Sequence, residues 1–318
     1  MMTAFTYGDG VVAALAQIAL IAEESPPADV AGSRAFYRKM ARLGGAPPHL
    51  DEVRDHSVET PGGPLGLRVY RPGPGPLPAL IFLHGGWFFL GDLETHDTLC
   101  RQLAAAARCV VIAVDYRRAP EHPCPAAPDD CFDAARWVVD HANDLGVDAA
   151  ALAIGGDSAG GALALVTARR ARDGGGPTFC AQLLFYPVIS SGQNSASWRE
   201  LPDAPIVNAD RARFAWSMYL PPGHGAPPAD VAPEAIQDLT GLPPTTVITA
   251  EYDPLRAEAE EFGARLRDAG VEVAVRRYPG MIHGFVGLAG VIPAGREAID
   301  EVATTLRAAF AATTGATT

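Results

Sequence analysis

A serine flanked by glycines, between an apolar run and an alanine-rich run, constrains this sequence most. The segment Gly156-Asp157-Ser158-Ala159-Gly160 directly follows the apolar residues 152–154 and leads into an alanine-rich stretch. We interpret the flanks as a strand and a helix, joined by a turn so sharp that its neighbours must be nearly free of side chains. Such a turn projects the hydroxyl beside the positive end of the helix dipole. The segment predicts a nucleophilic serine rather than a phosphate loop, which would need a lysine after the last glycine.

From about residue 57 onward, apolar β-branched runs alternate with alanine-rich stretches. This alternation is typical of βαβ units around a mostly parallel sheet. We expect eight strands, at 56–60, 65–71, 80–84, 109–115, 152–156, 179–186, 245–250 and 271–278. We expect helices between them, at 96–107, 129–143, 159–172, 255–269 and 294–311. The sequence therefore predicts an α/β protein with an eight-stranded, mostly parallel sheet flanked by helices.

Two segments interrupt this alternation. Residues 1–48 contain helical patterns at 11–22 and 33–43, and residues 191–243 contain one at 210–220 between proline-rich stretches. A long insertion inside a compact domain is usually functional, often as a lid or cap. We therefore expect one catalytic domain made of residues 49–190 and 244–318. Residues 1–48 and 191–243 are expected to form a helical cap over the C-terminal ends of the strands, where open α/β sheets bind ligands.

A serine nucleophile needs a base within hydrogen-bond reach, and that base must be oriented by a carboxylate. Asp253 and His283 follow two successive predicted strands, so we expect both on loops at the same sheet edge as Ser158. The alternatives without a catalytic role are that Asp253 only caps the next helix and that His283 is an exposed loop histidine. Glu251 is a competing acid that we rank below Asp253. The joint order of serine, acid and histidine favours a catalytic triad.

The segment His84-Gly85-Gly86-Trp87 ends a predicted strand. Backbone amides of this loop, at Gly85, Gly86 and Trp87, together with the amide of Ala159, are candidates to stabilise the oxyanion of a tetrahedral intermediate. The alternative is an ordinary Gly-Gly turn. Its position one strand–helix–strand unit before Asp115 fits the oxyanion role better.

Five segments together resemble the hormone-sensitive-lipase family of carboxylesterases, whose members share the α/β-hydrolase fold. They are His84–Asp92, Asp115–Asp130, Gly156–Gly161, Asp253–Arg256 and His283–Phe285. The resemblance covers about residues 70–312. It implies the triad Ser158, Asp253 and His283, and an oxyanion hole from Gly85, Gly86 and Ala159. It also implies a cap formed by the two interrupting segments, and a structural brace near the site at Tyr116–Pro123.

Trp87 departs from the family pattern, which has a third glycine at this place. We expect its amide still to donate, and we expect backbone angles that only glycine tolerates to be excluded there. We also expect the indole to narrow the acyl side of the site, in favour of short acyl groups.

Apolar side chains near these motifs are candidates to line a substrate pocket under the cap. Phe88 and Phe214 are the preferred candidates, and Ile282 is a further one. Asp157 lies beside the nucleophile and is expected at the substrate site, or as a brace for the turn alone. About half of the wider apolar set is expected to be plain core; that set is Trp87, Phe88, Phe89, Phe214, Trp216, Met218, Tyr219 and Ile282.

The charge and composition of the chain limit the kinds of partner that we expect. With 37 acidic residues against 25 Lys and Arg, the formal net charge is −12 and no basic patch is visible, which disfavours nucleic acids and anionic membranes. The apolar run Val11–Ala22 is shorter than the roughly 20 residues that span a bilayer. The five cysteines form no C-x-x-C pair and are expected to be reduced and buried. We expect a cytoplasmic protein without a metal or cofactor.

The resemblance implies a serine carboxylesterase that hydrolyses small, short-acyl carboxylic esters through an acyl-enzyme. An amidase or deacetylase of a specialised metabolite would use the same triad. A protein that binds a ligand without turnover is an alternative of a different class, but such proteins usually lose a triad member. The strand at 271–278 alternates valines with polar residues and is compatible with a homodimer through a sheet edge.

Overall fold

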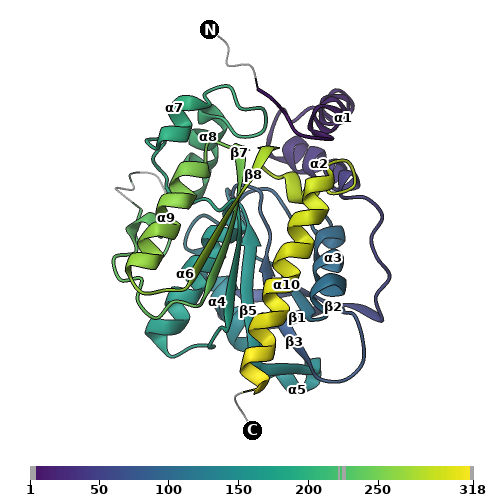
Figure 1. Ribbon diagram of the computed structural model, residues 1–318, viewed down its shortest axis with the longest axis vertical. Helices are drawn as coiled ribbons and strands as arrows, with labels where there is room; N and C mark the ends of the chain where they lie inside the picture. Colours follow the sequence, from purple (N-terminus) through teal and green to yellow (C-terminus); the bar gives the residue numbers. More distant parts are fainter. Residues whose placement is uncertain (1–4, 221–222, 224–226, 316–318) are drawn as a thin grey trace.

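A computed structural model describes residues 5–220, 223 and 227–315. The extreme ends of the predicted segments 1–48 and 244–318, and residues 221, 222 and 224–226 of the predicted cap segment 191–243, lie outside the described residues. The strands form one eight-stranded sheet in the order β1-β2-β4-β3-β5-β6-β7-β8 (Figure 1). Their bounds are β1 Glu52–Thr60, β2 Gly63–Arg71, β3 Leu77–Leu83, β4 Val110–Asp115, β5 Val147–Asp157, β6 Ala181–Phe185, β7 Thr245–Tyr252 and β8 Val273–Ile282.

The sheet is mostly parallel. Only β1 with β2 and β2 with β4 pair in the antiparallel sense, and every other neighbouring pair is parallel. Parallel neighbours need long crossover connections, which the helices between them supply. The predicted fold class, an α/β fold with an eight-stranded, mostly parallel sheet, is confirmed. β5 begins five residues earlier than predicted, because Val147 also pairs with Leu77 across an irregularity in the β3–β5 ladder.

The described helices are α1 Val11–Glu24, α2 Val30–Met40, α3 Asp97–Ala107, α4 Ala126–Asp140, α5 Ala142–Leu145, α6 Ala159–Gly174, α7 Ala196–Glu200, α8 Ala209–Tyr219, α9 Arg256–Asp268 and α10 Pro293–Gly315. Single-turn 3₁₀ helices occupy Ala41–Gly44, Pro233–Ala235 and Phe285–Leu288. All eight predicted helices are present, with ends shifted by up to four residues. The short helices α5 and α7 were not predicted, because four or five residues carry too little periodicity to be recognised.

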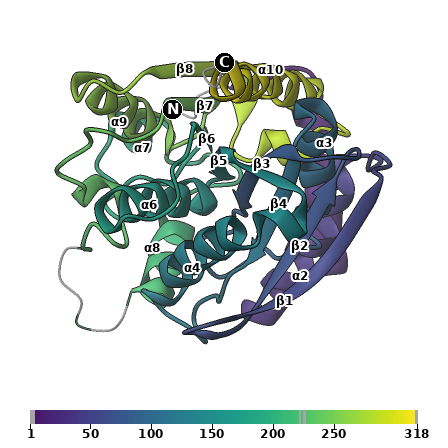
Figure 2. The same cartoon turned by 90° about the horizontal axis from the view of Figure 1, so that it is seen from below.

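The sheet separates two hydrophobic cores. Helices α3 and α10 cover one face, and α4, α6 and α9 cover the other (Figure 2). In β3, Leu80 and Phe82 face the first layer, whereas Ile81 and Leu83 face the second, as the two-residue strand period requires. Each such buried side chain contributes about 1.5–3 kcal/mol relative to exposure. A strand buried on both faces is expected to be predominantly apolar, and in β6 Gln182 is the one polar side chain among five buried residues.

Three parallel strands end at the same edge of the sheet, and each is followed at once by a predicted catalytic residue. β5 ends at Asp157, β7 at Tyr252 and β8 at Ile282, so Ser158, Asp253 and His283 are the next residues along the chain. Helices α1, α2, α7 and α8 lie at this end of the molecule, at the top of Figure 1.

The structure also shows the state of the cysteines and the character of the helices. The cysteines are free: four are buried, and Cys180 is half-buried. Within the described part of the chain, every helix is too short or too polar to cross a bilayer.

Candidate active site

The turn at Ser158 is strained and depends on its glycines. Ser158 has φ 54° and ψ −118°, an angle pair that costs a non-glycine residue about 1–3 kcal/mol. Its amide donates a hydrogen bond to the carbonyl of Phe185 at 2.8 Å, which fixes the turn to the end of β6. A Cβ at Gly156 or Gly160 would lie 2.3 or 1.8 Å from the carbonyl oxygen of Leu83. Only glycine therefore permits β5 and α6 to approach β3 this closely.

The structure brings the side chains of Ser158, His283 and Asp253 together. Nε2 of His283 lies 3.0 Å from Oγ of Ser158, and Nδ1 lies 2.7 Å from Oδ2 of Asp253. Their exposed fractions are 4%, 7% and 0%, respectively, so the chain of polar atoms is almost sealed from bulk water. A carboxylate on Nδ1 leaves the other ring nitrogen facing the hydroxyl, in the arrangement that general-base activation requires.

The carboxylate of Asp253 makes a second contact. Its Oδ1 accepts the amide of Leu255 at 2.9 Å, so Asp253 also holds the turn before α9, as the capping alternative proposed. Glu251, the competing acid, accepts the amide of Gly280 at 2.6 Å instead. Asp253 is thus the acid whose carboxylate contacts His283.

One predicted oxyanion donor is engaged elsewhere. The amide of Gly85 donates to Oδ1 of Asp157 at 2.8 Å, so the inclusion of Gly85 among the donors is wrong for this geometry. The amides of Gly86 and Ala159 have no hydrogen-bond acceptor in the part of the chain that the structure describes. For Ala159 this follows from its place as the first residue of α6, because the first amides of a helix have no partner within it.

The backbone at Trp87 corrects a second expectation. Trp87 and Phe88 have φ angles of 54° and 63°, in the left-handed region that favours glycine, so that region is not excluded here. Contacts from the predicted brace hold this unusual loop. The amide of Ala119 donates to the carbonyl of Phe88 at 3.0 Å, and the hydroxyl of Tyr116 donates to the carbonyl of His84 at 2.7 Å.

A histidine that sequence reasoning missed completes the surroundings of the serine. Nε2 of His96 lies 3.1 Å from Oδ1 of Asp157. Burial raises the pKa of Asp157, but the nearby His96 and the amide of Gly85 outweigh burial and leave that pKa below its ordinary value. No motif marked His96, because its partner is remote in the chain and its place before α3 looks like any helix start.

The site opens into a cavity of about 610 Å³. Ser158, His283, Asp157 and Trp87 line it on the side of the sheet. The opposite walls come from the two segments predicted as a cap: Leu15, Ile18, Phe36, Tyr37 and Met40 on one side, and Pro205, Ile206, Arg211 and Phe214 on the other. The cavity is mostly apolar with a few polar groups, among them Ser158 on the sheet side and Arg211 on the opposite wall, which is typical of small-molecule sites.

Two predicted pocket residues do not line this cavity. Phe88 is fully buried and stacks on Tyr219 of α8, with ring centroids 3.9 Å apart. Ile282 is also fully buried, in the core between the sheet and α10. Because side chains alternate along a strand, the residue that precedes His283 faces away from it. Phe214 and Asp157, by contrast, lie on the cavity wall.

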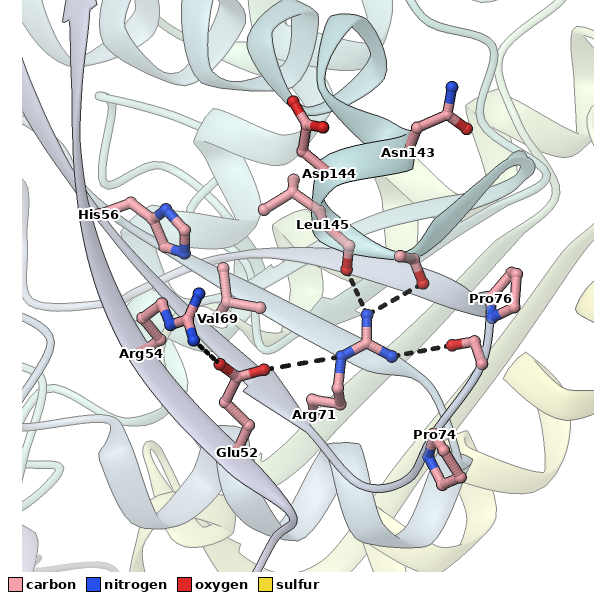
Figure 3. A pocket seen from close by; sticks show the side chains of 12 residues that line it. Glu52, Arg54, His56, Val69, Arg71, Pro74, Pro76, Asn143, Asp144 and Leu145 are labelled. Carbon is pink, nitrogen blue, oxygen red and sulfur yellow. Dashed lines mark hydrogen bonds and ion pairs between the residues drawn. The ribbon is translucent and has the colours of Figure 1, made fainter.

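A second hollow, of about 370 Å³, lies at the opposite edge of the sheet, where β3 and β5 begin (Figure 3). The guanidinium of Arg71 in this hollow donates to the carbonyls of Gly75 at 2.9 Å, Gly146 at 3.0 Å and Leu145. These donors are already used to close the surrounding loops, so we assign Arg71 a structural role. Among the described residues, no three His, Cys, Asp or Glu side chains are grouped as a metal ion requires.

Comparison with known proteins gives consistent matches. A family model described as the alpha/beta hydrolase fold matches residues 80–287. Esterase LipI of Mycobacterium tuberculosis is 43% identical over 283 residues, which are 87% of this chain and 88% of the relative. Carboxylesterase NlhH of the same species is 42% identical over 240 residues, 74% of this chain and 75% of the relative.

A solved structure is similar over nearly the whole chain. The ester hydrolase EH1AB1 from the metagenome of Lake Arreo is 38% identical and superposes with a TM-score of 0.90 over 96% of this chain and 100% of its own. The chain therefore belongs to the alpha/beta hydrolase fold family and, within it, to the carboxylesterases of the hormone-sensitive-lipase family.

Proposed function

We propose that this protein is a serine carboxylesterase in which Ser158 is the nucleophile, His283 the general base and Asp253 the orienting acid. The observation that carries the proposal is the continuous chain of contacts from Oγ of Ser158 through both ring nitrogens of His283 to Oδ2 of Asp253, at 3.0 and 2.7 Å. Each of the three residues lies directly after a strand of the rigid sheet. Placement on rigid elements preserves the alignment that nucleophilic catalysis needs.

In the first half of the reaction, Nε2 of His283 takes the hydroxyl proton while Oγ attacks the ester carbonyl carbon. The carbonyl oxygen becomes an oxyanion, which we expect the unengaged amides of Gly86 and Ala159 to stabilise, with that of Trp87 as a third candidate. Collapse of the intermediate breaks the bond to the alcohol, which leaves with the proton from His283. Water, deprotonated by the same histidine, then releases the acid from the acyl-enzyme.

The cavity supports an uncharged, fairly apolar ester as substrate, because its walls are mostly aliphatic and aromatic. The similarity to proteins named esterase and carboxylesterase favours an ester over an amide. We assign the cap role to residues 1–48 and 191–243, since helices from both segments complete the cavity opposite Ser158. The preference for short acyl groups is argued from Trp87, which lies on the cavity wall.

Burst kinetics with p-nitrophenyl acetate test this proposal. Wild type should release a stoichiometric burst of p-nitrophenolate before steady turnover, because the acyl-enzyme accumulates. Ser158→Ala should abolish both phases while the protein keeps its thermal melting temperature. Absence of turnover in wild type across a panel of esters would contradict the assignment. Faster cleavage of the matching p-nitroanilide would favour the amidase alternative.

A homodimer through β8 and a cytoplasmic location remain predictions. β8 is the last strand of the sheet, so its outer side has no neighbouring strand among the described residues, although the carbonyl of Gly280 near its end accepts the amide of Gly8 at 3.0 Å. Analytical ultracentrifugation of wild type and of an Ala274→Lys variant would test the dimer, because a charged side chain at this exposed position of the edge strand disfavours pairing with a second copy.

A further inference from the structure

A carboxylate that the proposed mechanism does not use lies close to the catalytic acid. Glu258 is in the first turn of α9 and is 6% exposed. Its Oε1 accepts the amides of Ile189 and Ser190, at 3.0 and 3.2 Å, and its Oε2 accepts Nε1–H of Trp198 at 3.2 Å. The three donors come from the segment after β6 and from α7. Glu258 therefore joins the insertion to the start of α9.

Ser197 of α7 makes the matching contact. Its hydroxyl donates to the carbonyl of Pro254 at 2.6 Å and accepts the amide of Ala257 at 3.0 Å, and its side chain is fully buried. Pro254 is the residue directly after Asp253. The backbone turn that carries the catalytic acid is thus held from the side of α7, which lies beside α9 in Figure 1.

We infer that Glu258 and Ser197 are positioning residues, which clamp α7 to the turn 253–258 and thereby hold Asp253 against His283. The inference rests on the proposed function, because it assigns the contacts of the catalytic acid. Within the turn, Oδ1 of Asp253 is occupied by the amide of Leu255, which leaves Oδ2 directed at the imidazole. Rotation of the turn would move both oxygens together, and misplacement by about 1 Å can cost 10²-fold in rate.

The burial of Glu258 supports a role beyond packing. Burial, together with the nearby charge of Asp253, raises the pKa of Glu258 to about 8 although three donors contact its oxygens. A buried acid beside another acid is an unfavourable arrangement, and an apolar residue of similar size often fills such a place at lower cost. Perturbed groups of this kind are concentrated at functional sites. The contacts with Ile189, Ser190 and Trp198 give this carboxylate a specific task, which is to tie the start of the insertion to α9.

Substitutions can break each half of the clamp separately. In Glu258→Gln the side-chain oxygen of the glutamine can still accept the two backbone amides. Its NH₂ group would then face the indole N–H of Trp198, and two donors cannot form a hydrogen bond with each other. Trp198→Phe removes that indole donor and should relieve the conflict in the double variant. Ser197→Ala removes the contacts to Pro254 and Ala257 without any change of charge. Glu260→Gln is the matched control, since Glu260 lies on the same helix and instead contacts Thr249 and Arg277.

The pH dependence of kcat/KM for p-nitrophenyl acetate provides the readout. Its acid limb reports the protonation of the catalytic base in the free enzyme. Asp253 contacts the imidazole at Nδ1, whereas the Tyr186 ring packed on it stays neutral because burial raises the pKa of that phenol well above its ordinary value. A loosened Asp253 stabilises the imidazolium less, so the acid limb should move to lower pH. Simple loss of folded protein would reduce the amplitude and leave the limb in place.

We expect Ser197→Ala and Glu258→Gln each to lower kcat/KM by about 10- to 100-fold and to shift the acid limb down by ~0.5 pH unit or more. The double variant Glu258→Gln/Trp198→Phe should lose less kcat/KM than the sum of the losses in Glu258→Gln and Trp198→Phe, because the donor conflict is absent from it. Glu260→Gln should remain within about twofold of wild type, because Glu260 contacts Thr249 and Arg277 and no part of the turn 253–258. Circular dichroism and thermal melting establish that each variant is folded.

Three outcomes would overturn the inference. They are an unmoved acid limb in folded Ser197→Ala, losses in Glu258→Gln that Glu260→Gln reproduces, and no recovery in the double variant. If Glu258→Gln does not fold, Ser197→Ala decides the question alone. Failure of the proposed function can be distinguished from failure of this inference. In that case wild type would show no burst of p-nitrophenolate, and its activity would not depend on Ser158.

Discussion

The carboxylate of Asp157 accepts a hydrogen bond from the amide of Gly85 at 2.8 Å, although the two residues are 72 positions apart in the chain. This bond joins the serine turn to the loop after β3. A Cβ at Gly85 would lie 2.3 Å from Oδ2 of Asp157, so only glycine allows the approach. The adjacent Gly86 lines the cavity, and its amide has no acceptor among the residues that the structure describes. The nucleophile and its proposed oxyanion donors are therefore held as one unit.

Asp157→Ala is expected to lower kcat/KM for p-nitrophenyl acetate by about 10²-fold, the typical cost of a lost oxyanion donor. The loop at Gly86 would lose its anchor, and the buried amide of Gly85 would lose its acceptor. Asp157→Asn retains an acceptor oxygen and should cost only about tenfold, since hydrogen bonds to neutral groups are the weaker ones. Equal activity in wild type and both variants, measured at steady state, would contradict this coupling.

Trp87→Gly is expected to shift the acyl-length profile toward longer chains. The indole lies on the cavity wall next to Gly86, so its removal adds space beside the reacting carbonyl. Glycine also relieves the strain of the positive φ at this position. Initial rates with p-nitrophenyl esters from acetate to octanoate measure the shift. An unchanged profile would refute the assignment of Trp87 to the acyl side.

Phe88→Ala should change the stability of the protein and leave its acyl-length profile unchanged. Phe88 is fully buried and stacked on Tyr219, so truncation should lower the free energy of unfolding by about 3–5 kcal/mol. The acyl-length profile of the folded variant should match that of wild type, because Phe88 lies outside the cavity wall. Urea denaturation and the same ester series test the two halves. A shift of the acyl-length profile like that expected for Trp87→Gly would indicate that Phe88 does line the substrate pocket.

The order of the motifs was sufficient to predict the fold and the convergence of Ser158, Asp253 and His283. The reason is geometric: in a parallel sheet the C-terminal ends of all strands meet at one edge, so residues that follow strands become neighbours. Strand and helix positions followed from hydrophobic periodicity, which burial on both faces of the sheet enforces. These features depend on local pattern and on topology alone.

Features that depend on side-chain direction escaped prediction. The inward turn of Phe88 follows from positive φ angles at Trp87 and Phe88, which residue type disfavours and only the surrounding contacts impose. The pairing of His96 with Asp157 and the capture of the Gly85 amide join segments far apart in the chain. Hydrogen bonds of this kind leave no periodic signal, so a single sequence offers no pattern from which to infer them.

The pKa of Glu258 leads to a prediction about stability. Since burial raises this pKa from 4.5 to about 8, folded protein binds a proton between these pH values that the unfolded chain has already released. Stability must then fall as pH rises through that interval, and it is not affected by Glu258 below the unfolded pKa. Glu258→Gln cannot titrate at this position. Relative to that variant, wild type should lose a few kcal/mol of unfolding free energy between pH 5 and pH 8. Urea denaturation at several pH values measures the difference, with Glu260→Gln expected to follow wild type. Parallel curves for wild type and Glu258→Gln would mean that Glu258 titrates alike in the folded and unfolded chains, and that its burial does not perturb it.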